Sequence, residues 1–459
     1  MSGALRAVLA LLVVCGAAAA CSDPAGPRAA GPAASVASGP AASVPPVDDQ
    51  DWITYHHDNA RTGVAPDLAP LGPLSVAWRA ALDGAVYGQP LVIGDRVYAA
   101  TEHDTVYALN ATTGAVVWST HVGEPQPKSG LPCGNIDPLG ITSTMAYDPP
   151  TGLLFALAET VGGGHTLVSI EAATGALRAR RAAEPPRGDR IAHQQRSALT
   201  VLDGQVYVSY GGLAGDCSRY FGSVVALPTT GAEPARTYAV PTTREAGMWT
   251  PGGAAVSGHT LYYSVGNGES TSGYDGSDSV LAMSRDLNRA DFFAPASWAD
   301  DNSGDLDLGS MSPAVVGRYV FIAGKRGTGY VLRADHLGGI GGQVTQAPVC
   351  EAYGGASVAG TTVYVPCNDG PRSVTVNDAG RLTVNWQGPA AAAGSPVVGG
   401  GAVWVLDYDG GVLYALDPVR GTVRQQVKVG RSPHFASPTL SRGRAFVGTM
   451  TGVTAVAGA

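Results

Sequence analysis

The sequence predicts an all-β protein, an eight-bladed β-propeller built from four-stranded antiparallel blades. One observation is a repeat, because the segment TVYALNATTGAVVW at 105–118 returns as VLYALDPVRGTVR at 412–424. Each copy contains an alternating apolar strand, a turn ending in Gly and a second strand, which together form half a propeller blade. A second observation is the composition, with 63 Gly, 32 Pro and 14% charged residues. This composition is typical of many short strands joined by tight turns, and helix should be scarce.

The blades can be counted from the small residues with which each inner strand should begin, since inner strands crowd around the ring axis. Eight such starts occur, at 88–90, 142–144, 196–198, 250–252, 311–313, 353–355, 394–396 and 436–438. Residues 75–459 then supply about 48 residues for each blade, within the usual range for propeller repeats.

The two ends of the propeller are expected to share one blade. Residues 437–459 supply only three strands, whereas residues 75–81 form an outer strand without a blade. We expect Val76–Ala80 to pair with Val453–Val456, so that neither end leaves an unpaired sheet edge.

The first twenty residues resemble an export signal, with Arg6, an apolar run from Ala7 to Val14 and small residues before Cys21. The sequence therefore predicts a cell-surface lipoprotein that is lipidated at Cys21 and contacts the membrane only through this anchor. Simple cleavage after Ala20 and secretion is the alternative. Residues 21–50 are rich in Ala, Pro, Gly and Ser and are expected to be a disordered linker, followed by the folded domain at 51–459.

Four cysteines remain in the exported domain, so two disulfides are expected. Three pairings are possible; we prefer Cys350–Cys367, which flank a predicted hairpin, and this leaves Cys133–Cys217. No Cys-x-x-Cys-His motif is present, so no covalent haem is expected. The net charge is −8 without a basic run, which makes nucleic acid an unsuitable partner. We expect a monomer.

One face of the predicted propeller collects the unusual side chains. In a propeller, the loop that leads into each inner strand and the loop between the second and third strands lie on the same face. This rule places on one face the four cysteines of the domain together with Arg196, Asp216, Trp249, Asn267, Asp305, Asp307 and Lys325.

These repeats resemble the pyrroloquinoline quinone (PQQ) repeats of quinoprotein alcohol dehydrogenases and of the assembly lipoprotein BamB. The opening segment 51–62 is similar to the Trp-x-x-Tyr-Gly-x-Asp start of those enzymes. The stretches 195–199, 211–217 and 305–342 also resemble polyvinyl-alcohol-dehydrogenase-like proteins.

The resemblance implies roles for individual residues. Trp249 matches the aromatic floor beneath the planar quinone, and Asp307 matches the catalytic base. Lys325 matches the cation that holds the quinone oxygens, and Asn267 matches a ligand of the calcium ion. We also assign Arg196 and Ser197 to cofactor binding and Asp216 to the position of a second calcium ligand.

The sequence departs from the dehydrogenase pattern at three places. No two cysteines are adjacent, the loop around Asp216 contains no Glu, and Leu306 replaces the Trp before the base. Two functions therefore stay open: a PQQ- and calcium-dependent dehydrogenase of a small alcohol or a polymer, or a BamB-like scaffold that binds a protein or polymer without a cofactor. In the second case these residues would serve packing and turn formation alone.

Overall fold

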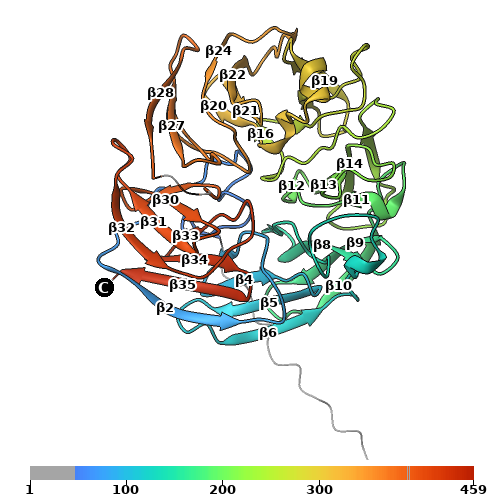
Figure 1. Cartoon of the computed structure of the whole chain (residues 1–459). Helices are drawn as coiled ribbons and strands as arrows, with labels where there is room; N and C mark the ends of the chain where they lie inside the picture. Colours follow the sequence, from blue (N-terminus) through green and yellow to red (C-terminus); the bar gives the residue numbers. More distant parts are fainter. Residues whose placement is uncertain (1–46, 390, 392, 459) are drawn as a thin grey trace, which may run out of the picture. The chain divides into compact units, whose positions relative to one another are not determined.

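A computed structural model of the chain describes residues 47–389, 391 and 393–458; Cys21 and the predicted leader and most of the linker lie outside them. The described residues form eight small antiparallel sheets arranged around a ring (Figure 1). The prediction of an all-β, eight-bladed propeller is confirmed. Helix in the described part is confined to α1 (Trp298–Ser303) and the 3-10 turns η1 (Lys128–Gly130), η2 (Arg190–Ala192) and η3 (Leu308–Ser310).

The blades are numbered here in chain order, with the innermost strand given first. Blade 1 contains β3 (Leu91–Ile93), β4 (Arg96–Ala100), β5 (Thr105–Asn110) and β6 (Val116–His121). Blade 2 contains β7 (Ala146–Asp148), β8 (Leu153–Thr160), β9 (Gly164–Glu171) and β10 (Leu177–Ala182). Blade 3 contains β12 (Thr200–Leu202), β13 (Gln205–Gly212), β14 (Ser223–Pro228) and β15 (Arg236–Ala239). Blade 4 contains β16 (Ala255–Ser257), β17 (Thr260–Val265), β18 (Ser279–Met283) and β19 (Arg289–Ala294).

The second half of the ring repeats this order. Blade 5 contains β20 (Ala314–Val316), β21 (Tyr319–Ala323), β22 (Thr328–Arg333) and β24 (Thr345–Pro348). Blade 6 contains β25 (Ser357–Ala359), β26 (Thr362–Val365), β27 (Arg372–Val376) and β28 (Leu382–Gln387). Blade 7 contains β29 (Val397–Gly399), β30 (Ala402–Asp407), β31 (Val412–Leu416) and β32 (Val423–Lys428). Three short strands extend blades 7, 3 and 4: β1 (Val64–Ala65), β11 (His193–Gln194) and β23 (Gly339–Ile340).

Blade 8 closes the ring as the sequence predicts. It combines β33 (Thr439–Ser441), β34 (Arg444–Thr449) and β35 (Gly452–Gly458) with β2 (Leu74–Ala81) from the start of the domain. The register pairs Val76 with Val456 and Ala80 with Val453. Strand β2, from the start of the domain, and the last strand, β35, therefore lie side by side in one sheet (Figure 1).

A repeated tryptophan contact joins neighbouring blades. Trp78 packs on Gly114, where a Cβ atom would come within 2.6 Å of the indole ring, and Gly114 also has a φ of +74°. Both conditions require glycine. The same contact recurs between Trp118 and Gly175 and between Trp386 and Gly421. The turn glycine of the sequence repeat therefore makes room for a tryptophan of the preceding blade, which packs against it.

The segment before the first blade fills the central channel. In chain order its backbone or amide groups bond to six inner strands: Trp52 to Val92, Ile53 to Tyr147, Asn59 to Val201 and Val256, Thr62 to Val358, and Gly63 to Val398. Arg61, only 2% exposed, donates to the carbonyls of Leu199 and Ala254. The segment therefore ties the inner strands together and closes the channel at this depth.

Candidate functional site

A cavity of about 340 Å³ opens where the chain leads into the inner strands, above the segment that fills the channel. Its lining consists of Tyr87, Asn135, Ile136, Gln194, Arg196, Ala214, Gly215, Asp216, Trp249, Pro251, Asp305, Asp307, Ser310, Lys325, Tyr353, His434 and Phe435. The volume lies within the range of small-molecule sites. Five residues to which the sequence analysis gives a role meet here, namely Arg196, Asp216, Trp249, Asp307 and Lys325.

Trp249 provides a flat aromatic surface within the cavity. Its indole rests on two glycines: a Cβ atom at Gly211 or Gly247 would come within 2.6 or 2.4 Å of the ring. Tyr220 meets the indole edge-on, with 6.4 Å between the ring centroids. The absence of side chains at the two glycines lets the ring lie close to the backbone while it still lines the cavity.

An ion pair between Lys325 and Asp307 dominates the wall from blades 4 and 5. The Lys325 Nζ lies 2.6 Å from Asp307 Oδ2 and 2.8 Å from Asp305 Oδ1. The Asp307 side chain is 9% exposed and that of Lys325 is 22% exposed. Burial acts to lower the pKa of Lys325, but the two carboxylates outweigh burial and raise it. Burial raises the pKa of Asp307, while Lys325 limits the rise.

The backbone around Asp307 fixes the direction of its carboxylate. The Asn267 N–H donates to Asp307 Oδ1 at 2.7 Å, and the Lys325 N–H donates to the Asp307 carbonyl at 2.9 Å. Buried Asp278 accepts from the next amide, that of Leu308, at 2.9 Å. Gly266 leaves room for this arrangement, because a Cβ atom there would lie 2.3 Å from Asp307 Oδ1. Asp307 is therefore held by its side chain and by both neighbouring loops.

Arg196 forms the opposite wall of the cavity. Its guanidinium lies 5.0 Å from the centroid of Tyr87 and 4.9 Å from that of Phe435, at cation–π distance. It also donates to the carbonyls of Thr142 and His434. Burial lowers the pKa of Arg196, and its guanidinium stays charged. The cavity thus has one cation on each side, Arg196 and Lys325.

Sequence reasoning missed the aromatic rim formed by Tyr87, Tyr353, His434 and Phe435. The rings of His434 and Phe435 stack with centroids 3.9 Å apart, and Tyr353 lies 5.4 Å from His434. All four residues stand at, or within two residues before, the small residues that start inner strands. The same pattern that counts the blades could therefore have found them.

Three predicted site residues have other contacts. Ser197 is buried outside the cavity lining, and its hydroxyl donates to the Thr250 carbonyl at 2.8 Å. Asp216 lines the cavity, but its Oδ1 accepts from the Tyr220 hydroxyl at 2.5 Å. Asn267 reaches Asp307 through its backbone N–H.

These contacts bear on the predicted calcium ion. Within the described residues, no three His, Cys, Asp or Glu side chains converge in a group that could hold a metal. Lys325 already supplies positive charge beside Asp307. Calcium binding through Asn267 and Asp216 therefore stays a prediction.

Both expected disulfides form. Cys133–Cys217 joins Cα atoms 6.1 Å apart, and Cys350–Cys367 joins Cα atoms 5.8 Å apart. The first bridge ties together the two loops that contribute Asn135, Ile136 and Gly215 to the lining. The second lies beside Tyr353. Each disulfide therefore braces a different wall of the cavity.

Comparisons with known proteins agree with this architecture. A family model described as outer membrane protein assembly factor BamB matches residues 74–272. The chain is 28% identical over 282 residues to a polyvinylalcohol dehydrogenase of Sphingopyxis sp. (strain 113P3), covering 55% of this chain and 40% of that protein. The chain thus spans less than half the length of this curated relative.

Solved structures share the fold. The quinohemoprotein alcohol dehydrogenase ADHIIG of Pseudomonas putida HK5 matches with a TM-score of 0.70 and 14% identity, covering 89% of this chain and 80% of that one. BamB of Moraxella catarrhalis matches with a TM-score of 0.57 and 15% identity, covering 83% and 99%. The resemblance to PQQ-type propeller repeats is confirmed. The described residues include no helix with the length and apolar character needed to span a bilayer.

Proposed function

We propose that the protein is an exported quinoprotein that binds PQQ in the cavity and oxidises an alcohol, either a small one or a hydroxyl group of a polymer. The observation that carries the proposal is the meeting of Trp249, Asp307, Lys325 and Arg196 in one cavity. These residues come from separate loops that are spread over more than a hundred positions of the sequence. They supply an aromatic surface, a carboxylate base and two cations, which a quinone site requires. The similarity to a polyvinylalcohol dehydrogenase supports the alcohol as substrate class.

The cavity suits a planar anionic quinone. Trp249 lines it with an indole that lies on two glycines, so a flat ring can stack there. Arg196 and Lys325 stand on either side as partners for carboxylate and quinone oxygens. The two cations and the aromatic rings therefore fit the charge and shape of PQQ.

Asp307 is the group that would accept the proton of the alcohol hydroxyl. A buried carboxylate with a raised pKa is a stronger base than an exposed one, and Lys325 and the Asn267 N–H keep it oriented. A bound PQQ would supply the hydride acceptor, so that loss of the hydroxyl proton to Asp307 and of a hydride from the carbon would convert the alcohol to a carbonyl compound. Lys325 would then pair with either Asp307 or the quinone oxygens.

The proposal is tested by adding PQQ to the purified protein and recording the absorption spectrum and alcohol-dependent dye reduction, with and without calcium. We expect a bound spectrum and dye reduction with the wild type. Asp307→Asn should keep the bound spectrum but lose about 10²–10⁴-fold in rate, the usual effect of removing a base. Trp249→Phe should weaken PQQ binding.

The matched control is Trp118→Phe, because Trp118 packs on Gly175 at the blade edge and does not line the cavity. This variant should bind PQQ as the wild type does. Absence of a bound spectrum and of dye reduction in the wild type would eliminate the dehydrogenase proposal.

A BamB-like scaffold is the second candidate function. It is favoured by the match of residues 74–272 to the BamB family model and by the fold shared with BamB. In that case a protein or polymer would bind the propeller face without PQQ. The absorption spectrum after addition of PQQ distinguishes the two functions, because only the dehydrogenase should give a bound spectrum.

We further propose that the protein is exported and anchored through a lipid on Cys21. Two disulfides in the domain support an oxidising compartment. Mass spectrometry should find a diacylglycerol on Cys21, and Cys21→Ala should release the protein from membranes. A soluble wild-type protein that starts at Cys21 without lipid would instead indicate simple secretion.

A further inference from the structure

Three acidic side chains are buried together behind the Arg196 wall, between blades 1 and 2. Glu102 and Asp104 come from the loop between β4 and β5, and Glu159 comes from β8. Their exposed fractions are 2%, 0% and 3%. Among the described residues, no lysine or arginine forms an ion pair with any of the three.

The acids receive few hydrogen bonds. Glu102 Oε2 accepts from the Gly140 N–H at 2.8 Å and from the Thr142 hydroxyl at 3.1 Å. Glu102 Oε1 and both carboxyl oxygens of Asp104 are buried without a hydrogen-bond partner in the described structure. An ionised carboxylate in such surroundings is costly, so the neutral acid is favoured.

The direction of the pKa shifts agrees with this geometry. Burial, opposed only in part by hydrogen bonds, raises the pKa of Glu102 to about 7. Burial and then the neighbouring Glu102 raise the pKa of Asp104 to about 9. Burial and the charges of Glu102 and Asp104 also raise the pKa of Glu159 well above its usual value.

Two of these acids contact the backbone that carries cavity residues. Gln194 and Arg196 line the cavity, and the amide of Gln195 between them donates to Glu159 Oε1 at 2.6 Å. Thr142 donates its hydroxyl to Glu102, while its carbonyl accepts from Arg196 at 3.5 Å. Glu159 thus holds the chain next to Arg196, and Glu102 holds the residue that orients the guanidinium.

We propose that Glu102 and Glu159 are positioning residues that act through Arg196 and make the binding of an anionic ligand in the cavity decrease as the pH rises. The ligand in this inference rests on the proposed function, whereas the coupling between the acids and the cavity wall does not. When the acids are neutral, Arg196 presents its full charge to the cavity. When Glu102 ionises, its negative charge offsets that of Arg196 and opposes a bound anion.

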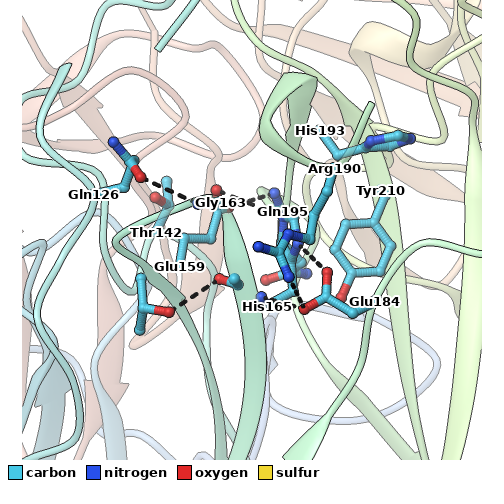
Figure 2. A network of polar contacts seen from close by, with 12 residues as sticks. Gln126, Thr142, Glu159, Gly163, His165, Glu184, Arg190, His193, Gln195 and Tyr210 are labelled. Carbon is cyan, nitrogen blue, oxygen red and sulfur yellow. Dashed lines mark hydrogen bonds and ion pairs between the residues drawn. The ribbon is translucent and has the colours of Figure 1, made fainter. Parts of the chain in front are cut away.

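Other titratable groups surround the acids and also influence their pKa values. Figure 2 shows His165 near Glu159, and its Nε2 lies 4.0 Å from Glu159 Oε2. The Nδ1 of His165 lies 3.1 Å from Glu184 Oε2. Arg190 reaches the other oxygen of Glu184 at 3.7 Å. The remaining charged or phenolic neighbours are Glu124, Arg180, Tyr87 and Tyr210. Glu184 and Arg190 are partly exposed, so the cluster extends from the cavity wall to the surface.

The sign follows from linkage. A bound anion near Glu102 disfavours the charged form of this side chain, so binding raises the pKa of Glu102 further. Above the free-state pKa, binding must therefore be accompanied by the uptake of a proton. Affinity is therefore constant below the free-state pKa of about 7 and falls above it. We expect the negative charge of an ionised Glu102 behind Arg196 to lower the affinity for an anion by about three- to tenfold. PQQ carboxylates stay ionised above about pH 5.5, so they do not supply this dependence.

The experiment measures PQQ affinity by quenching of tryptophan fluorescence from pH 5.5 to 8.5 in the wild type, Glu102→Gln and Glu233→Gln. Glu233 is an exposed loop residue and serves as the matched control. We expect affinity to fall about three- to tenfold across this range in the wild type and the control, and much less in Glu102→Gln. An equal fall in all three proteins overturns the proposal.

A second measurement works without any ligand, so that failure of PQQ binding does not remove the test. Hydrogen exchange of the Gln195 backbone amide, corrected for its intrinsic pH dependence, should slow in the wild type as Glu159 ionises with rising pH, because an ionised carboxylate accepts a stronger hydrogen bond from this N–H than a neutral acid does. Glu159→Gln, which keeps an acceptor but cannot ionise, should remove this slowing, and Glu159→Ala should reduce protection at every pH. If exchange is independent of pH in the wild type, the positioning role is refuted. If exchange behaves as expected but PQQ does not bind, only the proposed function fails.

Discussion

The two walls of the cavity bury acidic side chains in opposite ways. On the side of blades 4 and 5, Asp307 is paired with Lys325 at 2.6 Å and receives the Asn267 amide. On the side of blades 1 and 2, Glu102 and Asp104 have no cation partner in the described structure and keep unsatisfied oxygens. The first wall holds a carboxylate beside a compensating charge, whereas the second holds acids without a cation partner behind an arginine.

Under the proposed function, this difference would give one cavity both a base and a pH-sensitive support. A nearby ammonium group favours the charged form of a carboxylate, while burial beside other acids favours the neutral form. The paired acid suits proton abstraction near neutral pH. Glu102, whose pKa burial raises to about 7, would change charge in the same pH range, next to the wall that carries Arg196.

The largest expected effect comes from the disulfide bracing each wall. Replacing Cys133 and Cys217 by Ser should lower the free energy of unfolding by about 4 kcal/mol, because the closed loop spans 84 residues. Replacing Cys350 and Cys367, which are 17 residues apart, should cost about 3 kcal/mol. Urea unfolding of both double variants measures the two values. A larger loss at Cys350–Cys367 would show that loop length does not govern the difference.

Breaking the ion pair is expected to have the next largest effect. Lys325→Met leaves Asp307 buried without its cation and should lower the free energy of unfolding by about 3 kcal/mol. Adding Asp307→Asn should restore part of this loss, since the isolated charge is then removed. Lys428→Met on the exposed outer strand β32 should stay within about 0.5 kcal/mol of the wild type. If the double variant is no more stable than Lys325→Met, the pair is not coupled as described.

The unpaired acids predict how stability depends on pH. The pKa of Asp104 in the folded protein, about 9, lies above its usual value of 3.8. Its stabilising contribution is therefore complete below about pH 4 and is lost as the pH rises through about 9. The free energy of unfolding should fall from pH 6 to pH 9, and Asp104→Asn should reduce this fall by about 3 kcal/mol. Unchanged pH slopes would mean that Asp104 is ionised in the native protein.

The smallest effect sharpens the assignment of the ion pair. Asp305 also contacts Lys325, but its side chain is 64% exposed. Asp305→Ala should cost less than about 1 kcal/mol, as is usual for solvent-exposed ion pairs. Thermal unfolding should show a far smaller shift than for Lys325→Met, and a comparable shift would move the main partner of Lys325 from Asp307 to Asp305.

The regular parts of the fold could be predicted from the sequence because they repeat. Inner-strand starts and turn glycines recur along the chain. The strand at 75–81 belongs to no other blade, and the last blade lacks a fourth strand, so pairing beside Val453–Val456 could be predicted. The disulfides followed from the hairpin between Cys350 and Cys367. Trp249, Asp307 and Lys325 could be placed on one face because loop order in a propeller determines the face.

The contacts between distant loops could not be predicted. Ser197 follows Arg196 directly, yet its hydroxyl bonds to the Thr250 carbonyl outside the cavity lining, in a stretch between two strands where no regular period fixes side-chain direction. The segment around Arg61 gives no periodic signal, and its role in filling the channel depends on six separate blades. The acids behind Arg196 come from two blades, and nothing in their local sequence distinguishes Glu102 or Glu159 from solvent-exposed carboxylates.

The most direct test of the two-walled cavity is a crystal structure of the protein with PQQ. We predict that the quinone stacks on Trp249, with a carboxylate bonded to Arg196 and the quinone oxygens within hydrogen-bonding distance of Lys325. Asp307 should face the open side, where an alcohol would bind. PQQ located elsewhere, or a Trp249 indole covered by protein side chains, would contradict the account.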